Sequence, residues 1–254
     1  MVNDLLNARK ALKPVERPTK KEPNMTVKRA YELQEQLVSK LKSNGSVVAG
    51  YKLSPKTVKD PNDPSKMIPV YGYLFASMKL EPGVKIKKSD FIDLHLENEV
   101  AFIVGKEIDP KKINSPSDLK DYVKYVAPAI ELPEIRYSGS IDDVTGIDLV
   151  VDNVVASKII VGKGLPTNTV DADKVKVKMT RDGTTVNEGV STMVEGSPWN
   201  SLFWLVKELE KKNERVKPDH VIMTGGIANF MNSDPGVYKA TYDGLGEITF
   251  TVIR

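Results

Sequence analysis

Two segments of this chain combine the residue alternation of a β-strand with carboxylates among apolar neighbours. They are LHLENEVAFIVG at residues 94–105 and VAPAIELPEIRY at residues 126–137. Both are rich in residues that favour strands. Successive side chains of a strand point to opposite faces, so His95, Glu97 and Glu99 are predicted to share one face. A fold for this chain must therefore accommodate charged groups on a sheet.

Other segments add helices and further strands. Apolar residues recur at helical spacing from Thr26 to Asn44-Gly45, and residues 3–12 indicate a shorter helix. A hairpin is predicted at Asp182-Gly183, between two alternating stretches. Further strands are expected at residues 46–54, 220–226, 237–244 and 246–254. A helix is expected within residues 114–125 and another around residues 202–209, and residues 55–67 are expected to form a mobile, lid-like loop. Strands outnumber helices, which predicts an α+β fold with a mixed sheet.

The length of 254 residues is that of a single unit with a buried core. Three prolines among charges at residues 13–24 favour an arm, so we expect an N-terminal helix and arm at 1–24 and a single catalytic domain at 25–254. With 40% hydrophobic and 28% charged residues, the composition is typical of a globular protein. No signal-peptide pattern and no membrane span is visible, which predicts a cytoplasmic protein that does not contact membranes.

Charge and cysteine content exclude several function classes. The net charge of +3 is carried by lysines scattered among acidic residues, so no continuous basic face is expected and nucleic acid is not an expected partner. The chain has no cysteine. Thiolate nucleophiles, disulfides and zinc sites with cysteine ligands are therefore excluded.

The acidic residues of the two strand-like segments are the candidate metal ligands. Glu97 and Glu99 side by side repel each other unless they are protonated, paired, solvated or bound to a metal. A solvated strand face is the alternative. Glu131 lies in the apolar stretch APAIELP, where an unpaired carboxylate is costly to bury. Three carboxylates from two strands would form an oxygen-only site suited to Mg²⁺ or Mn²⁺, with open positions for water or substrate.

Two further features have both a functional and a structural interpretation. Lys52 follows the segment AGY, and it either covers apolar surface with its stem or places an ammonium near a substrate carboxylate. Thr224, Gly225 and Gly226 end a predicted strand. They form either a simple turn or a place where a ligand approaches the backbone.

Taken in order, several segments resemble the hydratase/decarboxylase branch of the fumarylacetoacetate hydrolase superfamily. They are KPVERPT, AYELQ, AGYKLS, PVYGYLFASM, LENEVAF, AIELPEIR, LVVDN and IMTGG…PG…GLGEITF, and they span nearly the whole chain. The resemblance implies a mixed, rolled β-sheet core with peripheral helices. It also implies a homo-oligomer that binds magnesium or manganese through acidic side chains.

The resemblance assigns roles to individual residues. Glu97 and Glu99 match the metal-binding Glu-x-Glu pair, and Glu131 matches the third ligand. Lys52 matches the active-site lysine. His95 stands where the family tends to carry a basic residue, which implies a catalytic position facing the metal pocket.

Other positions match the family less fully. Asp152 and Asn153 match a pair expected to hold the pocket geometry, or alternatively to cap a helix. Ser77 is expected to contact substrate together with Lys52 and with Thr224, Gly225 and Gly226, although the family often has an acidic residue at the position of Ser77. Residues 54–57 and Ala228 also depart from the family pattern.

The implied function is a metal-dependent lyase of aromatic-compound catabolism. It would act on a 2-hydroxy or 2-oxo unsaturated acid through a metal-bound dienolate, either as a 2-keto-4-pentenoate-type hydratase or as a 4-oxalocrotonate-type decarboxylase. One alternative is an acylpyruvate or fumarylacetoacetate-type hydrolase of carbon-carbon bonds, which needs a basic residue such as histidine to activate water. Another is a non-catalytic partner subunit of a hydratase-decarboxylase complex, since association with a pathway enzyme is also implied.

Overall fold

The computed structural model describes all residues from 1 to 254, in five α-helices and fourteen strands connected by short 3₁₀ turns. The helices are α1 (Val2–Ala11), α2 (Pro18–Lys21), α3 (Val27–Ser43), α4 (Gly146–Val151) and α5 (Pro198–Glu210). The strands are β1 (Val48–Lys59), β2 (Met67–Phe75), β3 (Lys79–Leu80), β4 (Lys85–Lys87), β5 (His95–Val104), β6 (Val123–Leu132), β7 (Lys158–Val161), β8 (Leu165–Pro166), β9 (Lys176–Arg181), β10 (Thr184–Val190), β11 (Val221–Gly226), β12 (Met231–Asn232), β13 (Gly236–Tyr242) and β14 (Gly246–Ile253).

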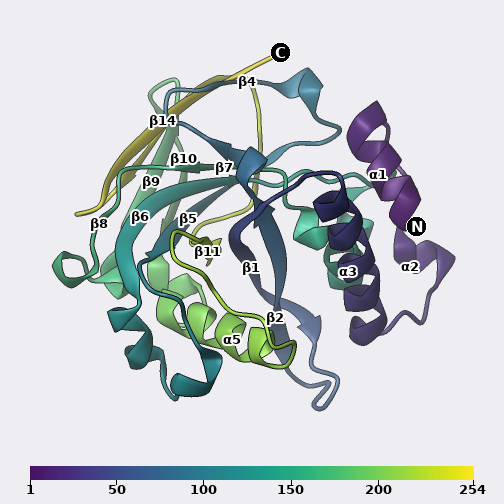
Figure 1. The fold of residues 1–254 in the computed structure, drawn as a ribbon. Coiled ribbons are helices and arrows are strands. Elements are labelled where there is room, and N and C mark those ends of the chain that lie inside the picture. The colour runs from purple at the N-terminus through teal and green to yellow at the C-terminus, as the bar shows by residue number, and fades with distance from the viewer.

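The larger sheet is mixed and strongly curled (Figure 1). Its main path runs β2-β1-β11-β5-β6-β7-β3, with β12 paired to β5 and β8 paired to β6. β1 is parallel to β11 and antiparallel to β2, whereas β5 is antiparallel to both of its main neighbours. The two strand-like segments with carboxylates thus become adjacent central strands. The expected α+β class with a mixed, rolled sheet and peripheral helices is confirmed.

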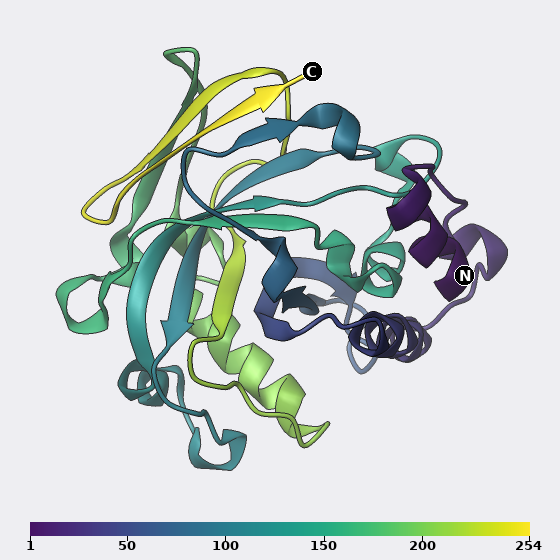
Figure 2. The same ribbon diagram turned by 45° about the horizontal axis from the view of Figure 1, so that its top comes forward.

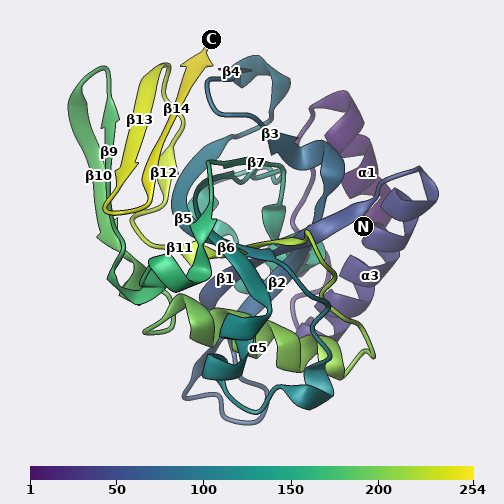
Figure 3. The same cartoon turned by 60° about the vertical axis from the view of Figure 1, so that its left-hand side comes forward.

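A second sheet of five strands has the order β10-β9-β13-β14-β4. Figure 3 shows β10, β9, β13 and β14 side by side at one edge of the molecule. β9 and β10 form the hairpin predicted at Asp182-Gly183, and Asp182 adopts the left-handed conformation (φ 50°) that such a turn requires.

Local signals explain where the long helices begin and end. The Thr26 side chain accepts a hydrogen bond from the backbone N–H of Arg29 at the start of α3, and Asn44 ends that helix. The Ser197 side chain accepts one from Trp199 at the start of α5, where Pro198 occupies the first helical position. Figure 2 shows α1 and α3 together on one side of the curled sheet and α5 on another. One large core lies within and between the sheets and under α5, and a smaller one lies under α1, α3 and α4.

Two local expectations are wrong. Residues 55–67 are not one long mobile loop, because β1 continues to Lys59 and pairs with β2 from Met67, which leaves only a turn at residues 60–66. Val58 explains the difference, since its buried side chain anchors this end of β1. The helix expected within residues 114–125 is a short 3₁₀ helix, Pro116–Asp121.

The N-terminal residues pack against the rest of the chain. Val2, Leu5 and Ala8 of α1 are buried, and Val15 pairs with Tyr137 in an isolated β-bridge. None of the helices combines the length and the apolar character needed to cross a membrane.

Candidate metal centre

Three glutamates converge on the inner face of the central strands. The antiparallel register places Glu97 of β5 directly opposite Glu131 of β6, and Glu99 opposite Ala129. Directly opposed residues bring their Cβ atoms to within about 5.5 Å, and residues two apart on a strand share a face. One carboxylate oxygen from each of Glu97, Glu99 and Glu131 lies within 4.8 Å of the other two. The structure therefore brings together the three acidic residues predicted from sequence.

The hydrogen bonding of these carboxylates is incomplete. Glu99 and Glu131 are fully buried, whereas Glu97 is partly exposed. The Oε2 atom of Glu99 accepts a hydrogen bond of 2.7 Å from the backbone N–H of Gly225. The Oε1 atom of Glu99 and the Oε2 atom of Glu131 accept no hydrogen bond, and the Oε1 atom of Glu131 contacts only the ammonium of Lys52. Burying a carboxylate oxygen without a hydrogen-bond donor costs free energy. A divalent cation bound between the three carboxylates would supply the missing partner.

The electrostatics of the cluster support this interpretation. Burial, and secondly the charge of Glu131, raise the pKa of Glu97 to about 7. Burial, followed by the charges of Glu131 and Glu97, raises the pKa of Glu99 well above its usual value. Without a cation, the folded protein thus holds some of these carboxyls protonated near neutral pH. A bound divalent ion would favour their ionised forms.

Lys52 of β1 is the cation that the protein itself supplies. Its Nζ atom lies 2.8 Å from Oε1 of Glu131 and donates a hydrogen bond of 3.1 Å to the carbonyl oxygen of Val154. Burial, the largest effect, lowers the pKa of Lys52, but the nearby charges of Glu131, Glu97 and Glu99 outweigh it and the pKa is raised. Lys52 is therefore a fixed ammonium beside the cluster, and not an apolar stem with a solvated head.

The carbonyl that holds Lys52 belongs to a strained turn. Asn153, Val154 and Val155 all have left-handed backbone conformations, with φ of 56°, 51° and 50°. Valine rarely adopts this conformation because of its branched Cβ, so the surrounding structure must hold the turn in place. The side chain of Asn153 does so through two hydrogen bonds with the backbone of Tyr73, at 2.7 and 2.8 Å.

Asp152, directly before this turn, lies in a buried charge network. Its carboxylate pairs with Arg136, at 2.9 Å, and with Arg9 of the N-terminal helix. Arg136 also pairs with Glu134 at 2.7 Å. Asp152 and Asn153 thus lie next to the turn that contacts Lys52, and the pocket-holding role that the resemblance implies for them stays a prediction.

The Thr-Gly-Gly segment brings its backbone close to the glutamates. Thr224 is buried and its hydroxyl donates to the carbonyl of Val100 at 2.7 Å. Gly225 donates to Glu99 as described, with φ of 113°. A Cβ on Gly226 would lie 2.8 Å from Oε1 of Glu97. Gly226 therefore makes room for a protein carboxylate, and Gly225 contributes its backbone N–H and a left-handed conformation; contact with a substrate stays a prediction.

Two predicted site residues lie apart from the cluster. His95 is buried at the start of β5, where its Nε2 lies 3.0 Å from Oδ2 of Asp93 and its ring stacks on Phe230 at 4.5 Å between centroids. Its nitrogens are not among the clustered ligand atoms. Ser77 is exposed in a 3₁₀ turn after β2, and its carbonyl accepts a hydrogen bond from Lys158. The structure does not bring Ser77 to the site.

A cavity of about 210 Å³ opens beside Lys52 and Glu97. Eleven residues line it, of which seven are hydrophobic. Its two charged lining residues are Lys52 and Glu97, and Ser54 adds a hydroxyl. Most of the remaining wall comes from the segment between residues 141 and 155 and from Phe230. The arrangement suits a small organic acid whose polar end faces the glutamates.

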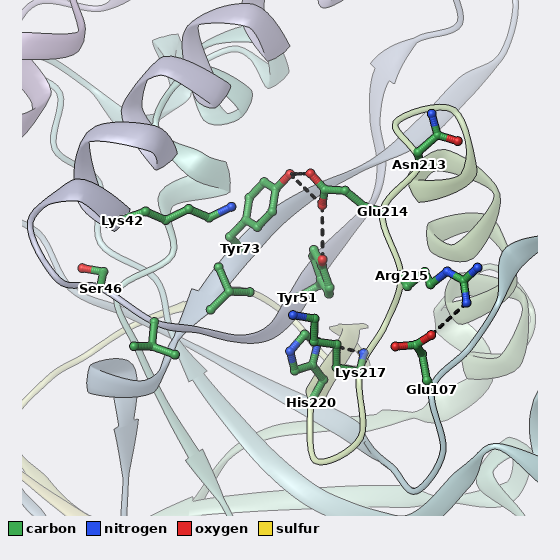
Figure 4. A pocket seen from close by; sticks show the side chains of 12 residues that line it. Lys42, Ser46, Tyr51, Tyr73, Glu107, Asn213, Glu214, Arg215, Lys217 and His220 are labelled. Carbon is green, nitrogen blue, oxygen red and sulfur yellow. Dashed lines mark hydrogen bonds and ion pairs between the residues drawn. The ribbon is translucent and has the colours of Figure 1, made fainter.

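A larger cavity of about 650 Å³ lies elsewhere, near the turn that precedes β1 (Figure 4). Tyr51 and Tyr73 both donate hydrogen bonds to the carboxylate of Glu214, at 3.1 to 3.3 Å. Arg215 donates to Glu107 at 2.8 Å. Because these polar groups satisfy one another and none of the clustered glutamates lines this cavity, the smaller cavity is the candidate active site.

Several residues of the site were missed from sequence. The hydrophobic wall, including Ile135 and Phe230, and the buried Arg136 network carry no spacing that separates them from ordinary core residues. One signal was available, because Glu134 and Arg136 stand two apart in a strand-like apolar segment, where only mutual pairing makes burial tolerable.

Comparison with known proteins relates this chain to lyases. No protein-family model matches it. A 4-oxalocrotonate decarboxylase from Pseudomonas putida is 26% identical over 96% of this chain and 92% of its own length. A 2-keto-4-pentenoate hydratase from Burkholderia vietnamiensis is 25% identical over 87% of this chain and 85% of its own length. The resemblance to the hydratase/decarboxylase branch is confirmed.

The fold has a solved counterpart. The structure of 4-oxalocrotonate decarboxylase from Pseudomonas putida G7, in complex with magnesium and adipate, matches with a TM-score of 0.89. The match covers 99% of this chain and 95% of that one at 24% identity. The fold expected from the resemblance is thus confirmed over the whole chain.

Proposed function

We propose that this chain, a relative of the hydratases and decarboxylases of the fumarylacetoacetate hydrolase superfamily, is a divalent-metal-dependent lyase. It would act on an unsaturated 2-hydroxy or 2-oxo acid in aromatic-compound catabolism. The observation that carries the proposal is the cluster of Glu97, Glu99 and Glu131 within 4.8 Å, beside a small and mainly apolar cavity that also contains Lys52.

The donor set fits a hard divalent cation, and we propose Mg²⁺ or Mn²⁺ held by Glu97, Glu99 and Glu131. When bound, such a cation stabilises the negative charge that develops on the 2-oxygen of the substrate. The partly exposed Glu97 lines the cavity, whereas Glu99 and Glu131 are buried behind it. The ion would therefore be reached from the side of Glu97.

Lys52 is the proposed catalytic and substrate-binding residue. A lysine ammonium has three donors, and the contacts with Glu131 and with the carbonyl of Val154 occupy two of them. Because Lys52 lines the cavity, the third donor is available to a substrate carboxylate or to the 2-oxygen. The strained turn at residues 153–155 fixes this position, which limits the reorganisation needed when charge develops.

For a hydratase the atoms balance without an oxidant or reductant. The enol proton of a 2-hydroxy-2,4-dienoate is lost and carbon 5 gains a proton, which gives a 2-oxo-3-enoate. The oxygen of water then bonds to carbon 4, and carbon 3 takes up a proton as the double bond is lost. For a decarboxylase, the far carboxylate of a longer oxo diacid leaves as carbon dioxide, and a proton takes its place.

One observation favours a second candidate, the carbon-carbon bond hydrolase. His95 is buried, pairs with Asp93 and stacks on Phe230, which lines the cavity. A histidine paired with a carboxylate is a typical general base for activating water. The ring is not part of the glutamate cluster, so we place hydrolysis second and propose that His95 assists by relaying protons.

The remaining expectations also stand as proposals. We propose a cytoplasmic homo-oligomer in which residues 25–254 form the catalytic domain and residues 1–24 form an N-terminal helix and arm. We also propose that the protein associates with another enzyme of the same pathway. Light scattering of the purified protein tests the first, and co-purification from the source cells tests the second.

The decisive experiment is incubation of the purified protein and magnesium with three substrates in parallel. They are a 2-hydroxy-2,4-dienoate, a 2-oxohexenedioate and an acylpyruvate. Loss of ultraviolet absorbance on the first, or release of carbon dioxide from the second, supports a lyase. Two acid fragments from the acylpyruvate, with no reaction on the other two, would establish the hydrolase instead. If the protein reacts with none of the three substrates, with either magnesium or manganese, the proposal that it is a lyase or hydrolase of such acids is contradicted.

A further inference from the structure

Apart from Lys52, Ser54 and Glu97, the residues in the wall of the candidate cavity are apolar. Ile141 and Val144 come from the turn before α4, Leu149 from α4 itself, and Val155 from the strained turn that follows. Phe230 lies beside them in the lining. Apart from Lys52, no basic side chain lines the cavity. A substrate group that reaches this wall therefore meets hydrocarbon.

Three arginines that contact or adjoin these segments are already paired. Arg136 is held by Glu134 and Asp152, and Arg9 is held by the same Asp152. Arg17 contacts Asp143. A second carboxylate on the substrate would have to break one of these pairs or remain uncompensated. Either outcome is costly where the wall shields that carboxylate from water, because an unpaired ionised carboxylate is among the most expensive groups to bury.

The mouth of the cavity adds to the discrimination. Ile141 is 37% exposed there, and the next two residues in the chain, Asp142 and Asp143, are both exposed. Asp143 is paired with Arg17, but the charge of Asp142 has the same sign as a substrate carboxylate and disfavours a second one at this end.

Resting on the proposed function, we propose that the substrate is a monocarboxylic unsaturated acid with a short apolar tail, and that dicarboxylic acids are rejected. The single carboxylate and the 2-oxygen face Lys52 and the glutamates, and the tail lies against Ile141, Val144, Leu149 and Phe230. Hydration, which keeps every carbon of the substrate, is then the reaction performed. Decarboxylation would need the far carboxylate that this wall excludes.

The test compares the specificity constants of the magnesium-loaded protein for two substrates. They are 2-hydroxypenta-2,4-dienoate, with one carboxylate, and 2-oxohex-3-enedioate, with two. We expect kcat/KM to be at least about a hundredfold higher for the monoacid, because the second carboxylate of the diacid finds no cationic partner in the cavity. An equal or larger kcat/KM for the diacid overturns the inference and leaves the lyase proposal standing.

A binding measurement tests the inference even if neither substrate reacts, an outcome that would contradict the proposed lyase. The probes are 2-oxopentanoate and 2-oxohexanedioate, which differ mainly in the second carboxylate. With magnesium present, the monoacid should raise the melting temperature at a concentration at least about tenfold lower than the diacid. A diacid that binds as well as the monoacid overturns the inference.

Two variants at one position provide the matched pair. Ile141→Lys places an ammonium at the mouth, where the exposure of Ile141 lets the longer side chain reach both water and the substrate tail. It should shift the ratio of kcat/KM toward the diacid by about tenfold or more, whereas Ile141→Met should leave the ratio unchanged. The same shift in both variants would show that size and not charge controls the choice, and would overturn the inference.

Discussion

Lys52 and Glu131 form an ion pair of 2.8 Å in which neither side chain is more than 2% exposed. They come from strands that are not neighbours in the sheet, since β11 and β5 lie between β1 and β6. The curl of the sheet brings the two side chains together across its inner face. The pair joins the only buried ammonium of the site to a cluster of three carboxylates, and it links activity with stability.

Removal of this ammonium should affect both properties. Lys52→Met leaves Glu131 buried without its cation, which should cost about 3–5 kcal/mol of unfolding free energy and at least about a hundredfold in turnover. The double variant Lys52→Met/Glu131→Gln removes both charges. It should recover most of the stability in denaturant melts and none of the turnover. Recovery of turnover in the double variant would contradict a direct role for Lys52.

Metal binding should depend on each clustered glutamate. Glu97→Gln and Glu131→Gln are expected to lose most of the rise in melting temperature that magnesium gives the wild type, because each removes one anionic ligand. In a chelator, Glu97→Gln should be at least as stable as the wild type, since the repulsion is reduced, whereas Glu131→Gln should be less stable, because it leaves the buried Lys52 without its partner. Glu107→Gln, in the larger cavity, is the matched control. Unchanged magnesium stabilisation in both ligand variants would disprove the assignment.

The pH dependence of stability follows from the raised pKa of Glu97. The unfolded chain releases this proton near an ordinary pKa of about 4.5, whereas the folded protein releases it near 7. Between these values the folded state binds more protons, so the free energy of unfolding falls as the pH rises. Melting temperatures in a chelator should therefore decrease from pH 5 to about pH 7.5. Magnesium should flatten this slope, and so should Glu97→Gln.

Gly226 should control the position of a metal ligand. A Cβ at this residue would lie 2.8 Å from Oε1 of Glu97. Gly226→Ala is therefore expected to displace that carboxylate and weaken magnesium affinity by about tenfold, the lower end for loss of support to a ligand. Titration calorimetry measures the affinity directly. An unchanged affinity would mean that Glu97 is not a ligand, or that it can move without cost.

The charge network of Asp152, Arg136 and Arg9 should contribute to the stability of the protein. Asp152→Asn leaves Arg136 and Arg9 without their shared carboxylate, and about 3–5 kcal/mol of stability should be lost. Arg9→Met should cost less, because Arg9 is partly exposed and Asp152 keeps Arg136. Denaturant melts give both values. If the Arg9 variant loses as much as the Asp152 variant, the N-terminal helix carries more of the network than its exposure indicates.

Much of the candidate site could be predicted from local patterns. Strand alternation placed Glu97 and Glu99 on one face, and the apolar surroundings of Glu131 indicated that its charge needs a partner. The same alternation also placed His95 on that face, yet its ring turns to Asp93 and Phe230 at the end of the strand. Periodicity predicts a face of the strand but not the direction of a side chain beyond Cβ.

What the sequence determined by itself is the set of strands and helices and the presence of buried acidic residues, because these depend on neighbours a few positions apart. Only the tertiary structure decided which side chains meet. The register of β5 and β6, the curl that brings Lys52 to Glu131, and the turn that places Val154 under Lys52 all join residues far apart in the chain. The apolar wall that selects the substrate is likewise formed by packing, since its residues resemble any core residue until the fold leaves a cavity beside them.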